Sequence, residues 1–319
     1  VTVEANLTKE HRDLQVAALT ANPAQYTAAI VANSSIVPLM NDGLIRPLDD
    51  LVAKHGGALQ PHQLITIDGK IMAVAFMANA QHLFYRSDIL EAAGVGVPST
   101  YADVVAAAKA IEAAGIMDNP VALNTKTGWN LGEEFVNMYM GTGADFFKPG
   151  SAEVSINNEN GVAALNMLKD LVDVSSPDFL TFDSNATQAL WEGGQLALAT
   201  MWGSRGGGIL DDEGSSADVV NSTVLTGAPT LMGDNVASTL WWDGFTIPAN
   251  ISDEDAEATF VALMNGVSDD VIKAKNDAAV WLSAAYTAGP ASAGVAATAA
   301  AGANPYPMLP FMGLLHGAL

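Results

Sequence analysis

Short β-prone runs alternate with capped helices along this chain, and this alternation restricts the possible fold more than any other feature. Residues 27–32 have strand composition, and residues 65–75 read as a hairpin that turns at Asp68-Gly69. Further on, Thr100 and Asp103 form a capping-box pattern at the start of an alanine-rich helix. Strands that alternate with helices are typical of layered folds. We therefore expect an α/β protein.

Several apolar positions are expected to belong to the core. The helix predicted at 157–172 carries Val162, Leu165, Leu168 and Leu171 at helical spacing, as its apolar face. Trp191 lies within another amphipathic helix and is expected to be buried. The glycines at 206–208 lack the Lys-Ser/Thr ending of a phosphate loop, so we interpret them as a flexible connection or a close-approach loop.

The strong negative charge narrows the class of partner. The chain has 319 residues, a net charge of −22 and no cysteine. Nucleic acids and anionic membranes both require basic surface, so we exclude nucleic acid as a partner. Disulfides and thiolate metal sites are impossible, and no apolar run reaches the roughly 18 residues of a membrane span. The length suits two domains.

The first candidate binding stretch is Trp241-Trp242-Asp243-Gly244. Side chains alternate along a strand, so one indole would pack into the core while the other faces an open surface. We choose Trp242 as the exposed ring, with Asp243 accepting hydrogen bonds from ligand hydroxyls and Gly244 letting a ligand approach the backbone. The alternative, that both indoles are core, stays open at this point.

Two more aromatic residues follow predicted strands and have polar neighbours. Trp129 lies in the loop with Thr125 and Thr127, and Trp202 precedes Ser204 and Arg205. Together with Trp242 they indicate a ligand cleft that is lined by stacking aromatic side chains.

Polar residues at other strand ends complete the candidate set. Asn79 and Gln81 alternate with apolar residues, so both side chains are expected in the same crevice. Asn33 lies at a strand–loop–helix junction, a position that lines the ligand crevice in open α/β sheets.

No catalytic or metal-binding pattern stands out. The five histidines form neither HExxH nor another close metal spacing, and no GxSxG element occurs. A glycosidase would need two carboxylates about 5–9 Å apart, but most of the acids fall in helix caps and solvated runs. We therefore expect no catalytic residues, no metal and no cofactor. A glycoside-processing enzyme remains a rival that would need a second acid near Asp243.

Several motifs, in order along the chain, carry a family resemblance. Residues 43–50 read GLIRPLDD, residues 68–90 contain DGKIMAV and LFYRSDIL, residues 188–199 read QALWEGGQLALA, and residues 242–248 read WDGFTIP. In this order they resemble the extracellular solute-binding proteins of bacterial ABC importers, specifically the carbohydrate-binding group related to maltodextrin-binding protein.

The resemblance implies two α/β lobes joined by hinge crossings, with a ligand cleft between them. We expect residues 1–106 and roughly 228–285 in the first lobe, and 107–227 and 286–319 mainly in the second. By position, the resemblance assigns ligand contacts to Asn79, Gln81, Trp202, Arg205, Trp242, Asp243, Gly244 and, in a more variable loop, Trp129. It also implies that the chain is incomplete at both ends, because strands and helices of the family are missing there.

The resemblance implies a monomeric periplasmic protein that captures a mono- or disaccharide or a glycoside for a membrane permease, without catalysis. A rival ligand is a quaternary ammonium compound held between tryptophans by cation–π attraction. The negative charge of the chain favours this rival, whereas Arg205 in the proposed cleft argues against it.

Overall fold

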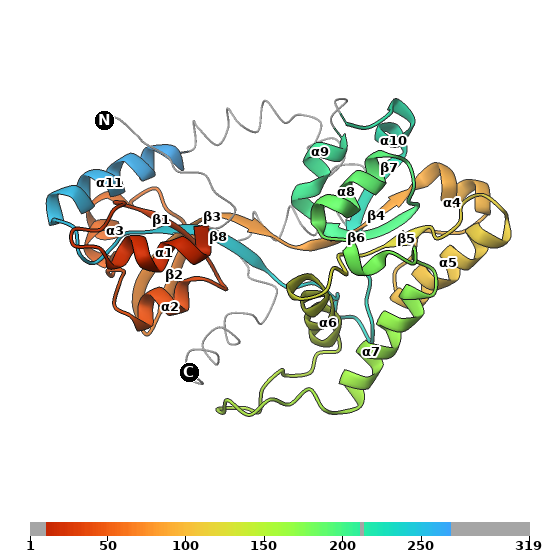
Figure 1. The fold of residues 1–319 in the computed structure, drawn as a ribbon, viewed down its shortest axis with the longest axis horizontal. Coiled ribbons are helices and arrows are strands. Elements are labelled where there is room, and N and C mark those ends of the chain that lie inside the picture. The colour runs from red at the N-terminus through yellow and green to blue at the C-terminus, as the bar shows by residue number, and fades with distance from the viewer. Residues whose placement is uncertain (1–10, 211–213, 269–319) are drawn as a thin grey trace. The chain divides into compact units, whose positions relative to one another are not determined.

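The chain folds into two compact units. A computed structural model describes residues 11–210 and 214–268. Within this range the first unit comprises residues 11–78 and 241–268, and the second comprises residues 79–240. The described chain therefore passes from one unit to the other at 78–79 and again at 240–241. Figure 1 shows helices and strands in both units.

The first unit contains one four-stranded sheet together with several helices. Its strands are ordered β1-β8-β3-β2 in one sheet, where β1 pairs antiparallel with β8 and β2 pairs antiparallel with β3. Its core includes Leu48, Val74, Phe245, Ile247 and Phe260. The elements are α1 (His11–Thr20), β1 (Ala29–Ala32), α2 (Ile36–Asn41), α3 (Asp49–His55), η1 (Pro61–Gln63), β2 (Leu64–Ile67), β3 (Lys70–Asn79), β8 (Trp241–Thr246) and α11 (Asp253–Gly266).

The second unit has its own sheet, ordered β5-β6-β4-β7. β4 pairs antiparallel with both β6 and β7, and β5 pairs parallel with β6. The elements are β4 (Gln81–Arg86), α4 (Ser87–Ala93), α5 (Tyr101–Ala113), β5 (Val121–Ala122), α6 (Trp129–Gly141), α7 (Glu159–Val172), η2 (Phe179–Thr181), α8 (Ser184–Glu192), β6 (Leu198–Trp202), η3 (Gly203–Arg205), α9 (Gly206–Leu210), α10 (Ala217–Ser222) and β7 (Thr223–Gly227).

The α/β fold class is confirmed, but the unit boundaries differ from those expected. Residues 79–106 and 228–240, which were expected in the first lobe, belong to the second unit. The reason is that β4 lies between β6 and β7 in the second sheet, so it cannot be separated from that unit. The chain therefore crosses between the units at the end of β3, and not in the alanine-rich helix α5, where the sequence placed the boundary.

Local sequence signals account for several elements. The predicted hairpin forms between β2 and β3, and Asp68 and Gly69 take the left-handed φ values of 51° and 75° that such a turn requires. The predicted capping box is present: Asp103 N–H donates to Thr100 Oγ1 (3.0 Å), while Asp103 Oδ2 accepts from Thr100 N–H (3.0 Å). The glycines at 206–208 are helical and belong to α9, so the expected flexible connection is not found.

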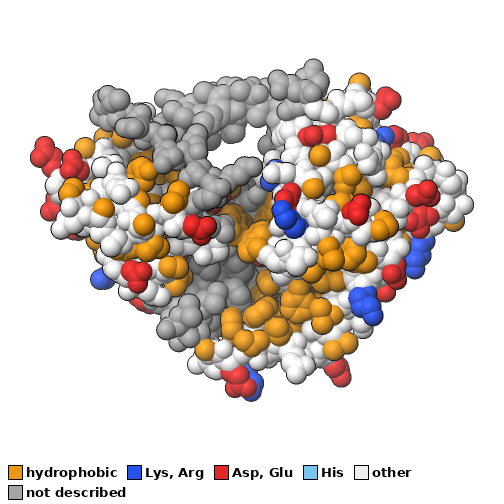
Figure 2. All heavy atoms as spheres, viewed as in Figure 1, with side chains coloured by type: hydrophobic (Ala, Val, Ile, Leu, Met, Phe, Trp, Pro, Cys, Tyr) orange, Lys and Arg blue, Asp and Glu red, His pale blue; other side chains and the backbone are white. Residues whose placement is uncertain are grey.

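The helix α7 buries a different face from the one expected. Leu168 and Leu171 are buried as predicted, but Val162 and Leu165 are 56% and 54% exposed. Their places against the core are taken by the small residues Gly161 and Ala164, which let the helix pack closely. Figure 2 shows hydrophobic side chains gathered on the second unit over α6 and α7.

Trp191 is a central core residue of the second unit, as expected. It is 1% exposed, packs edge-on against Phe84 with ring centroids 6.0 Å apart, and its indole N–H donates to Thr223 Oγ1 at 2.9 Å. The sequence also predicts a strand at residues 1–4 and a core position for Trp281, and both lie outside the described residues. Of the helices in 11–210 and 214–268, none is long and apolar enough to cross a membrane.

Replacing Trp191 with alanine is expected to lower the free energy of unfolding by about 3–5 kcal/mol, because the change opens a large cavity and leaves Thr223 without its donor. Urea unfolding followed by circular dichroism measures the change. Trp129→Ala is the matched control, since this indole is 47% exposed and should cost clearly less. Equal losses in both variants would contradict the assignment of Trp191 to the core.

Candidate functional site

An aromatic pair marks the candidate site of the second unit. Trp202 ends β6 and is 6% exposed, whereas Trp129 begins α6 and is 47% exposed. The two rings are stacked, with centroids 6.5 Å apart and planes 20° from parallel. Trp202 thus supports the ring of Trp129, and about half of the Trp129 side chain is exposed. An exposed indole is suited to the C–H faces of a sugar ring or to a cation.

Arg205 follows this pair and is held by the helix α8. Its Nη1 donates to Asn185 Oδ1 (2.9 Å) and to Gln188 Oε1 (3.1 Å). Burial lowers the pKa of Arg205, and the nearby negative charge of Asp183 opposes this shift. Its Nε is buried and has no hydrogen-bond partner among the described residues. The two bonds of Nη1 fix the plane of the guanidinium, so its N–H groups can be presented to an oxygen ligand in a defined orientation.

The carboxylate of Asp183 belongs to the start of α8. It accepts hydrogen bonds from the N–H groups of Asn185 and Ala186, both at 3.1 Å, and pairs with Lys126 Nζ at 3.0 Å. The bond from Ala186 N–H and the contact with Lys126 lower the pKa of Asp183. The side chain of Asp183 therefore caps α8, which begins at Ser184.

Asn79 lies beside the same loop. Its Nδ2 donates to Ser204 Oγ (3.0 Å), and its Oδ1 accepts from Ser204 N–H (3.3 Å). Ser204 is exposed and Asn79 is half-buried. The last residue of β3 is therefore tied to the turn that follows Trp202.

Gln81 has a different environment from the one that its alternation with Asn79 suggests. It is 2% exposed and its Nε2 donates to Glu134 Oε1 (3.0 Å), an acid that is fully buried on α6. Burial raises the pKa of Glu134 to about 8, against the hydrogen bonds from Gln81 and the Asn124 backbone. Burial also raises the pKa of the neighbouring Glu133, whose Oε1 lies 2.7 Å from Thr239 Oγ1.

The first unit carries the other predicted residues on β8 and at the end of β1. Trp241 and Asp243 are half-buried, and the Trp241 indole N–H donates to Asp243 Oδ1 at 3.2 Å. Trp242 points the other way and is only 7% exposed. The alternation is as expected, but the more accessible indole is that of Trp241. Ligand contact by Trp242 stays a prediction.

Asn33 lies at the same end of the first sheet as Trp241 and Asp243. The pairing of β1 with β8 sets Ala32 opposite Asp243, and Asn33 follows directly. Its Oδ1 is buried and has no hydrogen-bond partner among the described residues.

Gly244 has a structural reason to be glycine. A Cβ added there would lie 2.7 Å from Val74 O and 3.1 Å from the Cα of Ala75, so strand β3 occupies the space. The close approach that the sequence predicts for a ligand is made by a neighbouring strand.

The nine predicted residues thus fall into two groups, one in each unit. Asn79, Gln81, Trp129, Trp202 and Arg205 belong to the second unit, and Asn33, Trp242, Asp243 and Gly244 belong to the first. Sequence reasoning missed Trp241 as the accessible indole, since a period of two does not say which face is buried. It also missed the partners of Arg205 and the buried acid Glu134, which carry no motif.

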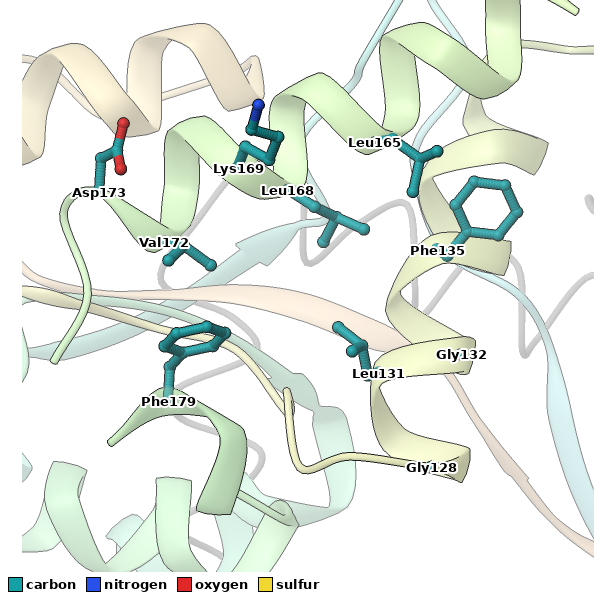
Figure 3. A pocket seen from close by; sticks show the side chains of 10 residues that line it. All are labelled: Gly128, Leu131, Gly132, Phe135, Leu165, Leu168, Lys169, Val172, Asp173 and Phe179. Carbon is teal, nitrogen blue, oxygen red and sulfur yellow. The ribbon is translucent and has the colours of Figure 1, made fainter. Parts of the chain in front are cut away.

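A separate apolar cavity of about 600 Å³ lies in the second unit, between α6 and α7. In Figure 3, Leu131, Leu168, Val172 and Phe179 point into a common space, while Lys169 and Asp173 turn away from it. None of the nine predicted site residues lines this cavity. Its lining offers few hydrogen-bonding groups, so it does not suit a ligand rich in hydroxyls.

Histidine and carboxylate side chains do not form a metal centre in the part of the chain that the structure describes. His82 is 5% exposed, and burial lowers its pKa against a hydrogen bond with Ala80 O. It is a core residue of the second sheet.

In the described range the chain forms two α/β units and connects them at two places, and one unit carries an aromatic platform beside fixed hydrogen-bonding groups. This arrangement is typical of solute-binding proteins. Residues 9–270 match the model of the bacterial extracellular solute-binding protein family, and the chain belongs to that family. The resemblance seen in the motifs is thereby confirmed.

Relatives of known sequence and structure agree with this assignment. A probable ABC transporter-binding protein of Deinococcus radiodurans is 24% identical over 143 residues, which is 43% of this chain and only about a third (34%) of that protein. Maltose-bound MalE3 of T. maritima superposes with a TM-score of 0.75 at 22% identity, over 97% of this chain and 78% of its own.

Two further solved structures show the same fold with other ligands. A solute-binding protein of Agrobacterium radiobacter K84 in complex with ribitol gives a TM-score of 0.75 at 21% identity, over 97% of this chain and 82% of its own. UgpB of Mycobacterium tuberculosis in complex with glycerophosphocholine gives a TM-score of 0.63 at 16% identity, over 80% of this chain and 66% of its own.

Gly244→Ala is expected to destabilise the first unit by about 1–3 kcal/mol, because the new methyl group would collide with the backbone of β3. Gly132→Ala on α6 is the matched control. Nothing lies within 4 Å of its added Cβ, so it should stabilise the protein by about 0.5–1 kcal/mol. Thermal unfolding measures both, and a neutral Gly244→Ala would show that β3 does not require this glycine.

Proposed function

We propose that this protein is the substrate-binding component of an ABC importer and captures a small carbohydrate or polyol in the periplasm. The observation that carries the proposal is the stacked pair of Trp129 and Trp202. It places a half-exposed indole beside the turn that holds Ser204 and Arg205. Ring faces bind the apolar side of a sugar, and the neighbouring polar groups bind its hydroxyls.

The supporting groups around this pair fit a ligand rich in hydroxyls. Arg205 supplies a fixed donor, and the amides of Asn79, Asn185 and Gln188 supply both donors and acceptors. We assign ligand contact to Arg205 and Asn79 and a supporting role to Gln81, which is buried. Asn33, Trp242 and Asp243 remain proposed contacts of the first unit, and we add Trp241, whereas Gly244 packs against β3 and is given a structural role.

The comparisons support this choice of substrate class by analogy. Related structures that share the fold were determined with maltose and with ribitol. Because these proteins are less than 25% identical to this chain, they support the substrate class but do not select the sugar.

A quaternary ammonium ligand is the second candidate. Trp241 lies against the carboxylate of Asp243, an arrangement that binds cations, and the net charge of −22 attracts them. One structure with this fold holds glycerophosphocholine, a ligand with such a headgroup. Arg205 opposes a cation near the Trp129 platform, so we rank this candidate second.

The direct test is calorimetric titration of the protein with maltose, ribitol, mannitol, glycine betaine and choline. We expect one equivalent of a sugar or polyol to bind per chain. Binding of betaine or choline alone would replace the first candidate by the second. Incubation with labelled di- and trisaccharides tests the enzyme alternative, since product release above background would contradict a pure binding role.

Trp129→Ala is expected to weaken binding of the titrated sugar by about 1–3 kcal/mol, the usual contribution of a stacked aromatic ring in a binding site. Val162→Ala removes an exposed apolar side chain elsewhere on the second unit and should leave affinity unchanged. Affinity in Trp129→Ala equal to that of the parent protein would exclude this indole from the site.

Arg205→Lys is expected to weaken binding by about 1.5–3 kcal/mol. Lysine keeps the charge but replaces the planar fork, which bonds Asn185 and Gln188 through Nη1, by one compact ammonium group, so the geometry of these contacts and of a ligand contact is lost. Lys126→Ala, which removes an exposed charge that pairs with Asp183, is the electrostatic control and should change affinity little. Affinity in Arg205→Lys equal to that of the parent protein would show that the positive charge alone is sufficient and would contradict a role of the planar guanidinium.

A further inference from the structure

A buried polar cluster lies next to the aromatic pair. Glu134 is 0% exposed, and Gln81 and Asn124 are each 2% exposed. Glu134 Oε1 accepts hydrogen bonds from Gln81 Nε2 and from the backbone N–H of Asn124, both at 3.0 Å. One carboxyl oxygen thus connects a strand, a loop and a helix.

The remaining polar atoms of this cluster are not satisfied. Glu134 Oε2, Gln81 Oε1 and both side-chain polar atoms of Asn124, Oδ1 and Nδ2, are buried without a hydrogen-bond partner among the described residues. No lysine or arginine of the described chain forms an ion pair with Glu134. A buried carboxylate with one bare oxygen and no counter-ion is very costly. A proton on Oε2 removes the charge and supplies a donor to a cluster in which two amide oxygens need one.

The three connected segments are those that carry the aromatic pair. Gln81 is the cross-strand partner of Trp202, so fixing Gln81 fixes the end of β6. Asn124 opens the loop that leads to Trp129, and Glu134 lies on the helix that Trp129 begins. The N–H of Gln81 also donates to Ser238 Oγ at 2.9 Å, next to the point where the chain leaves this unit.

We propose that Glu134 is held as a neutral acid and acts as a positioning residue for Trp129 and Trp202. By bonding Gln81 and Asn124 to α6, it fixes the distance and angle of the stacked rings. This role rests on the proposed function only in what the rings bind; the positioning itself can be measured without a ligand.

Ionisation of Glu134 is expected to disturb the pair as the pH rises. The ionisable groups that act on it are Glu133, its neighbour on α6, and Tyr101 on α5, and neither carries a positive charge. Burial raises the folded-state pKa of Glu134 to about 8, above its unfolded value. The neutral form thus stabilises the fold fully at low pH, and this contribution is lost as the pH rises toward about 8.

The first test compares the parent protein with Glu134→Gln, which keeps the shape and the hydrogen bonds of the neutral acid. Urea unfolding is measured between pH 5 and 9 without ligand. As the pH rises toward about 8, the equilibrium constant for folding of the parent should fall relative to that of Glu134→Gln by about tenfold per pH unit. If the unfolding free energies of the two proteins change with pH in parallel, Glu134 is not held as a neutral acid.

The second test follows the tryptophans. Near-ultraviolet circular dichroism should show the stacked-pair signal in the parent at pH 6, its loss at pH 9, and its retention at both pH values in Glu134→Gln. Trp129→Phe defines the part of the spectrum that belongs to the pair, and Glu134→Ala should lose that part at both pH values while remaining folded by far-ultraviolet dichroism. Retention of the pair signal in folded Glu134→Ala would exclude a positioning role.

The last arm measures binding of maltose, ribitol and mannitol at the two pH values. The parent should bind more weakly at pH 9 than at pH 6, and Glu134→Gln should bind equally at both. If the parent binds none of the three at either pH, the proposed function fails, while the unfolding and dichroism measurements still decide the role of Glu134. A pH-dependent affinity that Glu134→Gln shares would assign the effect to another group.

Discussion

The fold of the first unit depends on the close pairing of β3 and β8 in the middle of its sheet. The strand order β1-β8-β3-β2 makes them the two central strands. They are also the strands through which the chain leaves this unit and returns to it. Gly244 lets the backbones approach, and Thr246 Oγ1 donates to Met72 O at 2.8 Å across the same pair. A change in this pairing would therefore alter both connections together, and with them the setting of Trp241 and Asp243.

In the second unit, the orientation of the half-exposed Trp129 ring depends on the residues that support it. An aromatic platform binds well only when it is held rigidly, because a mobile ring must be ordered at the moment of binding. Trp202 supplies a stacked support for Trp129, and the bonds of Asn79 and Arg205 fix the turn that follows Trp202. Contacts within the protein thus hold the proposed site in place before a ligand binds.

Much of the fold could be predicted because its signals are local. Turn chemistry at Asp68-Gly69 and the capping box of Thr100 and Asp103 depend only on neighbouring residues, and both are present in the structure. The apolar face of α7 was predicted less well. Helical spacing groups Val162 and Leu165 with Leu168, but the small residues Gly161 and Ala164 decide which side can approach the core.

The candidate site was predicted as a set of residues but not as an arrangement. Alternation along β8 is visible in the sequence, whereas the choice between Trp241 and Trp242 depends on which face the sheet covers. Glu134 gave no signal at all, since an acid on a helix usually faces water. Its burial follows from Gln81 and Asn124, which come from distant positions in the chain. The unit boundaries differ from the prediction for the same reason, because long-range pairing with β6 and β7 places β4 in the second unit.

The way in which the chain connects the two units also has a consequence for folding. Residues 79–240 form a continuous insertion within the first unit, so joining β3 to β8 from an unfolded chain would close a very long loop, at an entropic cost of about 4–5 kcal/mol. If residues 79–240 fold first, they bring the ends of these strands together and remove most of that cost, so folding of the second unit lowers the entropic barrier to forming the sheet of the first.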